Sequence, residues 1–380
     1  MLHVVHWPFS GIGTLIRGVI QHLRGEVESH IVFLRRDESA LDEFRKVCTS
    51  VHCIDARDLR LTAFLRMRRL WNLLKPDIIH THSYQPLVWA CLLLPGTAKH
   101  VTTVHSDYPY LKGGGGRAWL KRETEALLLQ RFPVQVVAVG RHVLQLVAGL
   151  GVPDDRLALI ENGIDFDRWL VRNRIAEAER QRLGFDKHDF IFVSVGRLDI
   201  RQKGLDLLME ALSIAHRSCP LIKVLLVGDG PDRARVLALA ERLGVDGAIR
   251  VTGYVGDPRG FMYAADAYVS SSRFEGFGLA LAEAVACGLP AIATRAGVAD
   301  CIIDNRRTGI LVDVEDVTSI ANALITMATT TSASLAKMGH EGHKRVADLF
   351  DLRTTTGSYL SLYRAMMAQP GGGVERARDR

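Results

Sequence analysis

The sequence predicts an α/β protein built from two doubly wound, parallel-sheet domains. Short apolar runs alternate with helical patterns along the chain, which is the order of repeated strand–helix–strand units. Most of these runs are continuously apolar, as in strands that helices cover on both faces. The series also restarts once, after NGID at 162–165, and 380 residues are enough for two such domains.

The expected strands form two groups, separated by the charged, weakly patterned stretch after NGID. The first group comprises 2–7, 30–34, 76–82, 100–105, 134–139 and 158–161. The second comprises 190–197, 222–228, 248–253, 266–272 and 291–295. A boundary near 166–188 predicts an N-terminal domain over 1–168 and a C-terminal domain over 169–350. A last helix at about 351–367 could pack back on the N-terminal domain, and the glycine-rich, charged tail 368–380 is expected to be disordered.

Composition favours a cytoplasmic protein with an anionic partner. The formal net charge is +6, and bases outnumber acids between Arg57 and Arg131, which suits membrane lipid or a phosphate-bearing substrate. The six cysteines form no CxxC pair and no zinc spacing, so reduced thiols are expected. The N-terminus reads as a strand and no apolar run is long enough to span a bilayer, so we expect neither a signal peptide nor a transmembrane helix.

The stretch EGFGLALAEAVACGLP, 275–290, is the most informative motif. Gly276 to Gly278 predict a turn, and 279–287 a helix whose first amide groups and positive dipole end form a phosphate site. Glu275 stands before this helix and Glu283 one turn inside it, so both carboxylates can point toward a ligand at the helix start. The alternative is a surface glutamate together with a glutamate that pairs with a core arginine.

GRLDIRQKG, 196–204, follows a predicted strand at the carboxyl end, where α/β sheets bind ligands. Arg197 offers a bidentate fork to phosphate and Lys203 a point charge. The alternative is a pair of solvated bases in a polar loop.

FSGIGT, 9–14, links the first strand and helix, and Gly11 and Gly13 allow the backbone to approach a phosphate closely. The dinucleotide fingerprint requires a glycine where Ile16 stands, and the next predicted strand runs into Arg35 rather than an acidic residue. An NAD-dependent enzyme is therefore disfavoured.

TTVHSDY places His105 at a strand end, beside Ser106 and Asp107. A histidine there could donate to a substrate hydroxyl or transfer a proton. His80 and His82 end the neighbouring strand, but no cysteine or carboxylate completes a metal ligand set at a typical spacing, so we expect no metal. The alternative is that these are core or rim histidines with backbone partners.

The pattern 59–75 predicts a basic, aromatic-bearing helix that could lie on an anionic membrane. An expected loop, KGGGGRAWLKRE at 112–123, adds Trp119 and further bases. The alternative is an ordinary core-packing helix with a solvated basic face.

Together these motifs resemble the large family of retaining, nucleotide-sugar-dependent glycosyltransferases called family four, or glycosyl transferases group 1. That family has the GT-B fold, in which two Rossmann-like domains face a central cleft. The resemblance is densest from Arg156 to Val312, and the Glu275/Glu283 pair is its most specific feature. The motifs that carry it are LIENGID, SVGRLDIRQKG, LLVGDGPDRARV, VTGYV, SSSRFEGFGLALAEAVACGLPAIAT and NRRTGILV, with KPDIIHTHS and TVHSD in the N-terminal half.

The resemblance implies a role for each matching residue. Catalysis would depend on His105, Glu275, Arg197 and Lys203. The last two would bind the donor diphosphate, with Gly11, Gly13 and the amides of Gly278 and Leu279 close to it. Glu283 would accept hydrogen bonds from the ribose hydroxyls. The donor sugar would contact Glu275, Phe277 and His105, and the nucleobase would lie beside Gly253, Tyr254 and Val255. No cofactor or metal is implied, only a UDP- or GDP-sugar as donor substrate.

The activity implied is the transfer of a hexose, with retained configuration, to the hydroxyl of a carbohydrate or lipid-linked acceptor in cell-envelope polysaccharide, lipopolysaccharide or glycolipid synthesis. Such a protein would be cytoplasmic and peripheral at the inner face of the plasma membrane, without nucleic-acid partners. The alternatives are a GT-B-fold sugar-nucleotide epimerase and a non-catalytic sugar-nucleotide-binding subunit. Two departures from the family pattern leave the acceptor open: AGVAD at 296–300 replaces GGxxE, and Val139–Gly140 replaces a Val–Ser pair.

Overall fold

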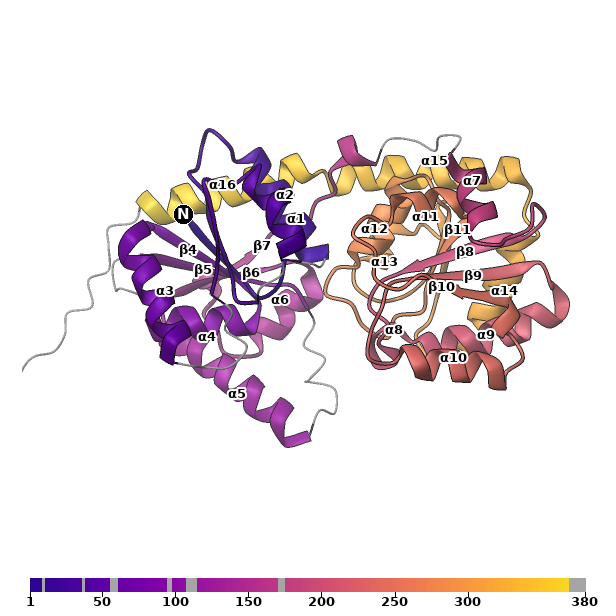
Figure 1. The fold of residues 1–380 in the computed structure, drawn as a ribbon, viewed down its shortest axis with the longest axis horizontal. Helices are drawn as coiled ribbons and strands as arrows, with labels where there is room; N and C mark the ends of the chain where they lie inside the picture. The colour runs from indigo at the N-terminus through magenta and orange to yellow at the C-terminus, as the bar shows by residue number, and fades with distance from the viewer. Residues whose placement is uncertain are drawn as a thin grey trace, which may run out of the picture. The chain divides into compact units, whose positions relative to one another are not determined.

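The computed structural model describes residues 1–8, 11–35, 38–54, 61–93, 98–106, 115–169 and 175–368. The chain divides into two compact units (Figure 1). Unit 1 holds Met1–Gly163 and the segment that starts at Leu352, and unit 2 holds Ile164–Asp351. The chain passes between units at Gly163 and again at Asp351, whereas the predicted domains meet at residues 168 and 169 and end at 350. The expected disordered tail lies, apart from Ala368, outside the described residues.

Unit 1 is built on a seven-stranded parallel sheet of order β3-β2-β1-β4-β5-β6-β7. The strands are β1 (Leu2–Val5), β2 (His30–Phe33), β3 (Ser50–Cys53), β4 (Ile78–His82), β5 (Lys99–Val104), β6 (Val134–Ala138) and β7 (Leu157–Leu159). The strand order reverses between β1 and β4, which is the point where open α/β sheets bind ligands.

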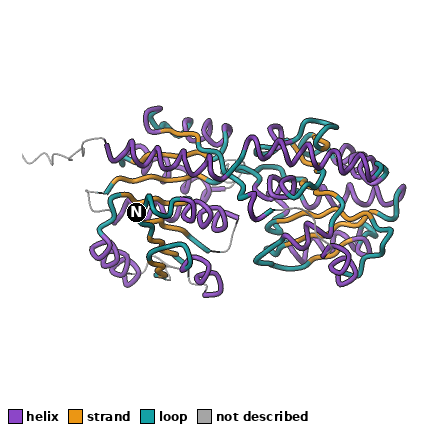
Figure 2. Tube along the Cα trace, turned by 90° about the horizontal axis from the view of Figure 1, so that it is seen from above, coloured by secondary structure: helices purple, strands orange, loops and turns teal. Residues whose placement is uncertain are grey.

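Helices cover both faces of this sheet, as Figure 2 shows for the layers of helices and strands. They are α1 (Gly11–His22), α2 (Glu38–Arg45), α3 (Leu61–Leu74), α4 (Tyr84–Leu93), α5 (Gly115–Arg131), α6 (Arg141–Ala148) and α16 (Leu352–Ala368). On one face, Val4 and Ile79 pack against Met67 and Trp71 of α3. On the other, apolar residues of β1 and β2 pack against α1 and α2.

The last helix, α16, lies against α1 in unit 1 (Figure 1). A Cβ on Gly18 of α1 would lie 2.7 Å from Leu352 Cδ2, so a side chain there would push the two helices apart. Arg364 near the end of α16 forms an ion pair with Glu26 at 2.8 Å. Contacts near both of its ends therefore hold α16 in unit 1, although it is far from α1 in sequence.

Unit 2 is built on a six-stranded parallel sheet of order β10-β9-β8-β11-β12-β13. The strands are β8 (Phe190–Val195), β9 (Ile222–Val227), β10 (Ile249–Val251), β11 (Ala267–Ser270), β12 (Ala291–Thr294) and β13 (Gly309–Val312). The helices are α7 (Ile175–Arg182), α8 (Ile200–Lys203), α9 (Leu205–Ser218), α10 (Arg233–Arg242), α11 (Arg259–Ala264), α12 (Leu279–Ala286), α13 (Ala299–Ile302), α14 (Val317–Ala328) and α15 (Ser332–Leu349). A continuous apolar core joins the sheet to α9, α10 and α14. Here the strand order reverses between β8 and β11.

Two strands and one helix differ from the predicted elements. β3 and β13, each at the edge of its sheet, are absent from the predicted strands. The expected loop at 112–123 is wrong from residue 115 onward, because α5 begins at Gly115. Among the described residues, no helix combines the length and the apolarity needed to cross a bilayer.

Candidate active site

The loops at the carboxyl ends of β8, β11 and β12 lock together at the point where the strand order of unit 2 reverses. Gly204 adopts φ 57°, and a Cβ there would lie 2.1 Å from the carbonyl oxygen of Ser271. Ser271 Oγ in turn donates to the carbonyl oxygen of Lys203 at 2.9 Å. A Cβ on Gly297 would lie 2.2 Å from the carbonyl oxygen of Phe277. Glycine at both positions allows the loops to form one rigid edge.

Lys203 and Glu275 form an ion pair on this edge, although 72 positions separate them in the chain. Lys203 Nζ lies 2.5 Å from Glu275 Oε1, and the side chains are only 20% and 14% exposed. Ser272 Oγ donates to the same carboxylate oxygen at 2.8 Å. The lysine stem crosses Gly196, where a Cβ would lie 3.1 Å from Lys203 Cε. The structure thus brings together two predicted site residues and adds Ser272, which the sequence did not single out.

Arg197 differs from Arg273, another arginine near this edge. Its side chain is exposed and, within the described part of the chain, its guanidinium has no hydrogen bond or ion pair. Arg273, by contrast, binds Asp206 bidentately at 2.8 and 2.9 Å, and hydrogen bonds to Asp206 and then Glu315 raise its pKa. Arg197 is therefore a cation available to an anionic ligand, while Arg273 holds loops together.

Glu283 is half-buried on α12, and its carboxyl has no hydrogen-bond or ion-pair partner among the described residues. Burial raises its pKa to about 7; Arg168 opposes this shift and Asp257 adds to it. A carboxyl without a partner that is only partly ionised near neutral pH is suited to bind hydroxyl groups. The sequence did not single out Arg168, and the only signal for it was its position shortly after NGID.

The start of α12 is open to a ligand. Gly278 forms its N-cap with φ 99°, provides no side-chain cap, and has open space around the position of a Cβ. The first amide groups of a helix have no intrahelical acceptor, so an anion can satisfy them. Leu279, the first residue of α12, is half-buried.

The other residues of unit 2 that were predicted to contact the sugar nucleotide differ in their exposure. The Phe277 ring is 2% exposed and packs edge-on against Phe350, with ring centroids 5.0 Å apart. A contact between Phe277 and a sugar would therefore have to come from its main chain. Tyr254 is 53% exposed and Val255 is half-buried. Both follow β10, an edge strand of the sheet.

The predicted glycines of unit 1 lie in the first turn of α1. A Cβ on Gly13 would lie 2.1 Å from the carbonyl oxygen of Pro8, so local packing alone requires glycine there. Gly11 is exposed. Phe9 and Ser10 of the same motif lie outside the described residues.

His105 follows β5 and is buried, and its partner is another histidine. His105 Nε2 lies 3.1 Å from His82 Nδ1. His80 bonds Tyr363 and Thr103, each at 2.7 Å. The suggestion of backbone partners for His80 and His82 is therefore wrong, because both ring nitrogens of each histidine bond side chains. Asp107 lies outside the described residues.

Ligand nitrogens of His3, His80 and His82 all lie within 4.8 Å of one another, which is close enough for a metal ion. Both ring nitrogens of His80 are already bonded to hydroxyl groups, and both of His82 to other histidines. The sequence-based expectation of no metal stays a prediction.

The two departures from the family pattern also have structural counterparts. Asp300 forms an ion pair with Arg295, which also bonds Asp313 at 2.9 Å. Gly140 is the N-cap of α6 and provides no side-chain cap.

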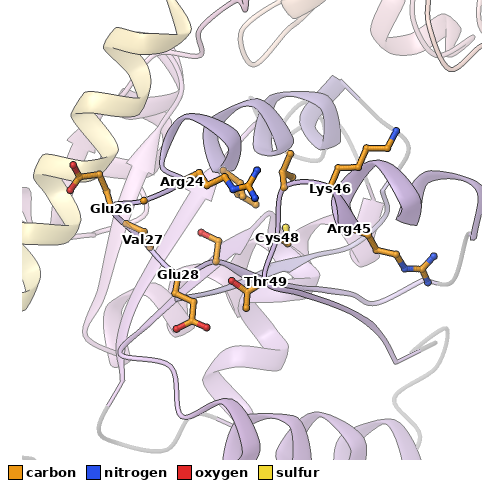
Figure 3. Close-up of a pocket in the computed structure, with 12 residues that line it drawn as sticks. Arg24, Glu26, Val27, Glu28, Arg45, Lys46, Cys48 and Thr49 are labelled. Atoms are coloured by element: carbon orange, nitrogen blue, oxygen red, sulfur yellow. The ribbon is translucent and has the colours of Figure 1, made fainter.

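A separate cavity of about 400 Å³ lies in unit 1 between the end of α1 and the segment before β3. Its lining includes the charged side chains Arg24, Glu26, Glu28, Arg45 and Lys46 (Figure 3). It contains no predicted site residue and lies at the amino ends of β2 and β3, opposite the edge where ligands bind in such sheets.

Known proteins resemble this chain over almost its whole length. The family model Glycosyltransferase Family 4 matches residues 9–168, and Glycosyl transferases group 1 matches residues 175–345. The lipopolysaccharide core biosynthesis glycosyltransferase LpsE of Rhizobium meliloti (strain 1021) is 29% identical over 189 residues, 50% of this chain and 54% of LpsE. The chain thus spans about half the length of that relative.

Two further likenesses cover more of the chain. The UDP-Gal:alpha-D-GlcNAc-diphosphoundecaprenol alpha-1,3-galactosyltransferase of Escherichia coli is 26% identical over 277 residues, 67% of this chain and 68% of that enzyme. The crystal structure of HepE from Anabaena, in complex with UDP and glucose, has a TM-score of 0.82 at 18% identity, over 97% of this chain and 99% of that one. With both family models matched in order, the chain belongs to the glycosyl transferases group 1 family and has the GT-B fold of these glycosyltransferases.

Proposed function

We propose that the protein transfers a hexose from a nucleoside-diphosphate sugar to an acceptor hydroxyl, with retained configuration, in the synthesis of a cell-envelope polysaccharide, lipopolysaccharide or glycolipid. One observation carries this proposal: the Lys203–Glu275 pair shares one sheet edge, beside the open start of α12, with Arg197 and Glu283, whose charged groups have no hydrogen-bond or ion-pair partner among the described residues. The names of LpsE and of the E. coli galactosyltransferase support the substrate class.

The site would bind the donor through its charges and hydroxyls. Arg197 and the amides at the start of α12 take the diphosphate, and Lys203 exchanges part of its contact with Glu275 for a phosphate oxygen. Glu275 is then free to accept hydrogen bonds from the sugar hydroxyls, while Glu283 accepts from the ribose diol. Charge neutralisation by Arg197, Lys203 and the helix amides makes a metal ion unnecessary for the donor.

Departure of the diphosphate builds negative charge on its oxygens. Arg197, Lys203 and the helix amides stabilise that charge more in the transition state than in the bound donor, which is the condition for faster chemistry. The acceptor oxygen forms the new glycosidic bond on the face that the diphosphate leaves. The departing phosphate takes the acceptor proton, so retention requires no covalent nucleophile from the protein.

Thermal unfolding with UDP, GDP, ADP, NAD and their sugar conjugates, without metal, tests the donor. A ligand at a hundred times its dissociation constant adds about 2.7 kcal/mol of stability. We expect UDP or GDP and its sugar conjugate to raise the midpoint by several degrees, at roughly 2–4 °C per kcal/mol. NAD should leave the midpoint unchanged.

Product analysis with the sugar nucleotide that raises the unfolding midpoint then separates the alternatives. Transfer predicts a new glycoside only when an acceptor is present. Epimerised sugar nucleotide formed without acceptor would support the epimerase instead. Binding without turnover of any acceptor class would support the non-catalytic subunit, and the absence of every shift in a folded sample would contradict the donor site.

We also infer that unit 1 contacts an anionic membrane at the cytoplasmic face, through α5 rather than through α3. In α3, Met67, Leu70 and Trp71 are buried in the core, so its main apolar face and its tryptophan already have a partner, and Leu65 and Leu73 are exposed outside that face. In α5, Trp119, Leu120 and Leu127 are 60%, 60% and 63% exposed, and basic side chains stand among them. Such a surface suits a lipid-linked acceptor.

Vesicle co-sedimentation tests this surface. We expect the protein to bind vesicles that contain anionic lipid at low salt, and Trp119→Ser to weaken binding several-fold, because one large apolar side chain would no longer enter the interface. The matched control is Leu237→Ser, which removes an exposed apolar side chain, 41% exposed, from α10 of unit 2. Equal binding by the two variants, or no binding by the unmodified protein, would contradict the inference.

A further inference from the structure

Three histidines form a buried row across unit 1. His3 belongs to β1, His82 to β4, and His105 directly follows β5. His3 pairs with His80 in the register of β1 and β4, and His82 with Thr103 in that of β4 and β5. Side chains two positions apart point to the same face of a strand, so all three rings lie on one face of the sheet.

The ring nitrogens form a continuous hydrogen-bonded chain. His3 Nδ1 lies 3.2 Å from His82 Nε2, and His82 Nδ1 lies 3.1 Å from His105 Nε2. The rings are nearly parallel, at 18° and 26°. At the two ends, His3 Nε2 and His105 Nδ1 are buried without a hydrogen-bond partner in the described part of the chain. His80 is anchored separately, by Tyr363 and Thr103.

All three rings are neutral, because burial lowers the pKa of His3 and His105 to about 3 and that of His82 well below its ordinary value. A neutral imidazole carries one N–H and one lone pair, so both bonds of the chain must point the same way. Either His105 Nδ1 carries the terminal N–H and His3 Nε2 a lone pair, or the reverse.

The two arrangements differ in where the unpaired donor lies. In one, the N–H is enclosed at His3 Nε2, in a ring only 1% exposed. In the other, it lies at His105 Nδ1, just past the carboxyl end of β5, at the edge where ligands bind in such sheets. A buried N–H without an acceptor is costly, and the second arrangement is favoured in the free protein because the His105 ring is 9% exposed against 1% for His3, so solvent or a ligand oxygen can approach it.

We propose that His82 and His3 are positioning residues that hold His105 in its Nδ1–H tautomer, so that His105 donates a hydrogen bond to a substrate hydroxyl at the carboxyl edge of this sheet and accepts no proton. This proposal rests on the proposed function for the identity of the ligand. The chain of hydrogen bonds belongs to the protein alone and can be measured without substrate.

Nitrogen-15 NMR of the full chain, labelled at histidine, tests the chain in the free protein, with His105→Asn used to assign the signal. Substituting His3→Leu removes the N–H that donates to His82 Nε2. His82 can then carry its proton on either ring nitrogen, so His105 should become a mixture of tautomers. His3→Asn, whose amide can replace Nδ1–H, should restore the single Nδ1–H form. The matched control is His100→Leu, because His100 is equally buried on the opposite face and bonds Thr81 instead.

Kinetics supply the second readout. We expect His3→Leu to lower kcat about tenfold, of the order of one lost hydrogen bond, with the donor KM little changed. His3→Asn should recover most of that loss, and His100→Leu should leave kcat unchanged even where it lowers the unfolding temperature. If His3→Leu changes the His105 tautomer but the protein transfers no sugar, the hydrogen-bonded histidine row is supported and the proposed function is rejected.

Two outcomes would overturn the proposal. One is a His105 tautomer that His3→Leu leaves unchanged. The other is tight Zn²⁺ binding to the unmodified protein that His3→Leu abolishes, because it would assign the His3, His80 and His82 nitrogens to a metal ion rather than to one another.

Discussion

Glu283→Gln is expected to stabilise the free protein at about pH 8 while it weakens binding of the sugar nucleotide. The folded pKa of Glu283 is about 7, above the ordinary 4.5. Between these values the folded state binds more protons than the unfolded state, so the free energy of unfolding falls as pH rises and the loss is complete above about 7. Glutamine does not titrate and keeps the shape. The gain is at most about 3 kcal/mol at 1.36 kcal/mol per pKa unit, reduced by solvent screening because the residue is half-buried.

Unfolding curves at about pH 5 and pH 8 measure the effect on stability. Calorimetric titration with the sugar nucleotide that raises the unfolding midpoint measures the effect on binding. The control is Glu210→Gln, an exposed glutamate on α9 of the same unit. It should change neither stability nor binding. A Glu283→Gln protein less stable than the unmodified one at pH 8 would show that the carboxyl already has a favourable partner. Unchanged donor binding would remove Glu283 from the proposed site.

Arg197→Ala should lower kcat/KM by about 10²- to 10³-fold, roughly 2.7–4 kcal/mol, without lowering the stability of the free protein. The loss is large because the guanidinium would face charge that grows as the diphosphate departs. Stability should be unaffected because, among the described residues, Arg197 is exposed and its guanidinium has no hydrogen-bond or ion-pair partner to lose. Initial rates with the accepted donor and an unfolding curve measure the two quantities.

Two other arginines serve as controls. Arg217→Ala removes an exposed arginine that bonds only a backbone carbonyl in the last turn of α9, and should change neither rate nor stability. Arg273→Ala should instead lower the unfolding temperature, since it leaves Asp206 without its bidentate partner. A tenfold or smaller effect of Arg197→Ala on kcat/KM would contradict the role of Arg197 at the diphosphate.

The predictable parts of this protein are those that local pattern encodes. Continuously apolar runs located eleven of the strands, and glycines before an apolar helix located the open start of α12. The sequence did not predict β3, because its four residues are only half-buried at a sheet edge. β13 escaped because it begins with Gly309, where a Cβ would lie 2.2 Å from the carbonyl oxygen of Ala291, so close strand packing selects a residue that ordinarily marks a turn.

By itself, the sequence determined the fold class, the family resemblance and the identity of the charged residues, since these follow from periodicity and from motifs a few residues long. Only the tertiary structure decided which charges meet. Lys203 pairs with Glu275, whereas Arg197 and the Glu283 carboxyl have no hydrogen-bond or ion-pair partner among the described residues. His3, His82 and His105 form a hydrogen-bonded row across three strands. Parallel strands set residues far apart in sequence side by side, and the pairing register that aligns them depends on the packing of the whole sheet.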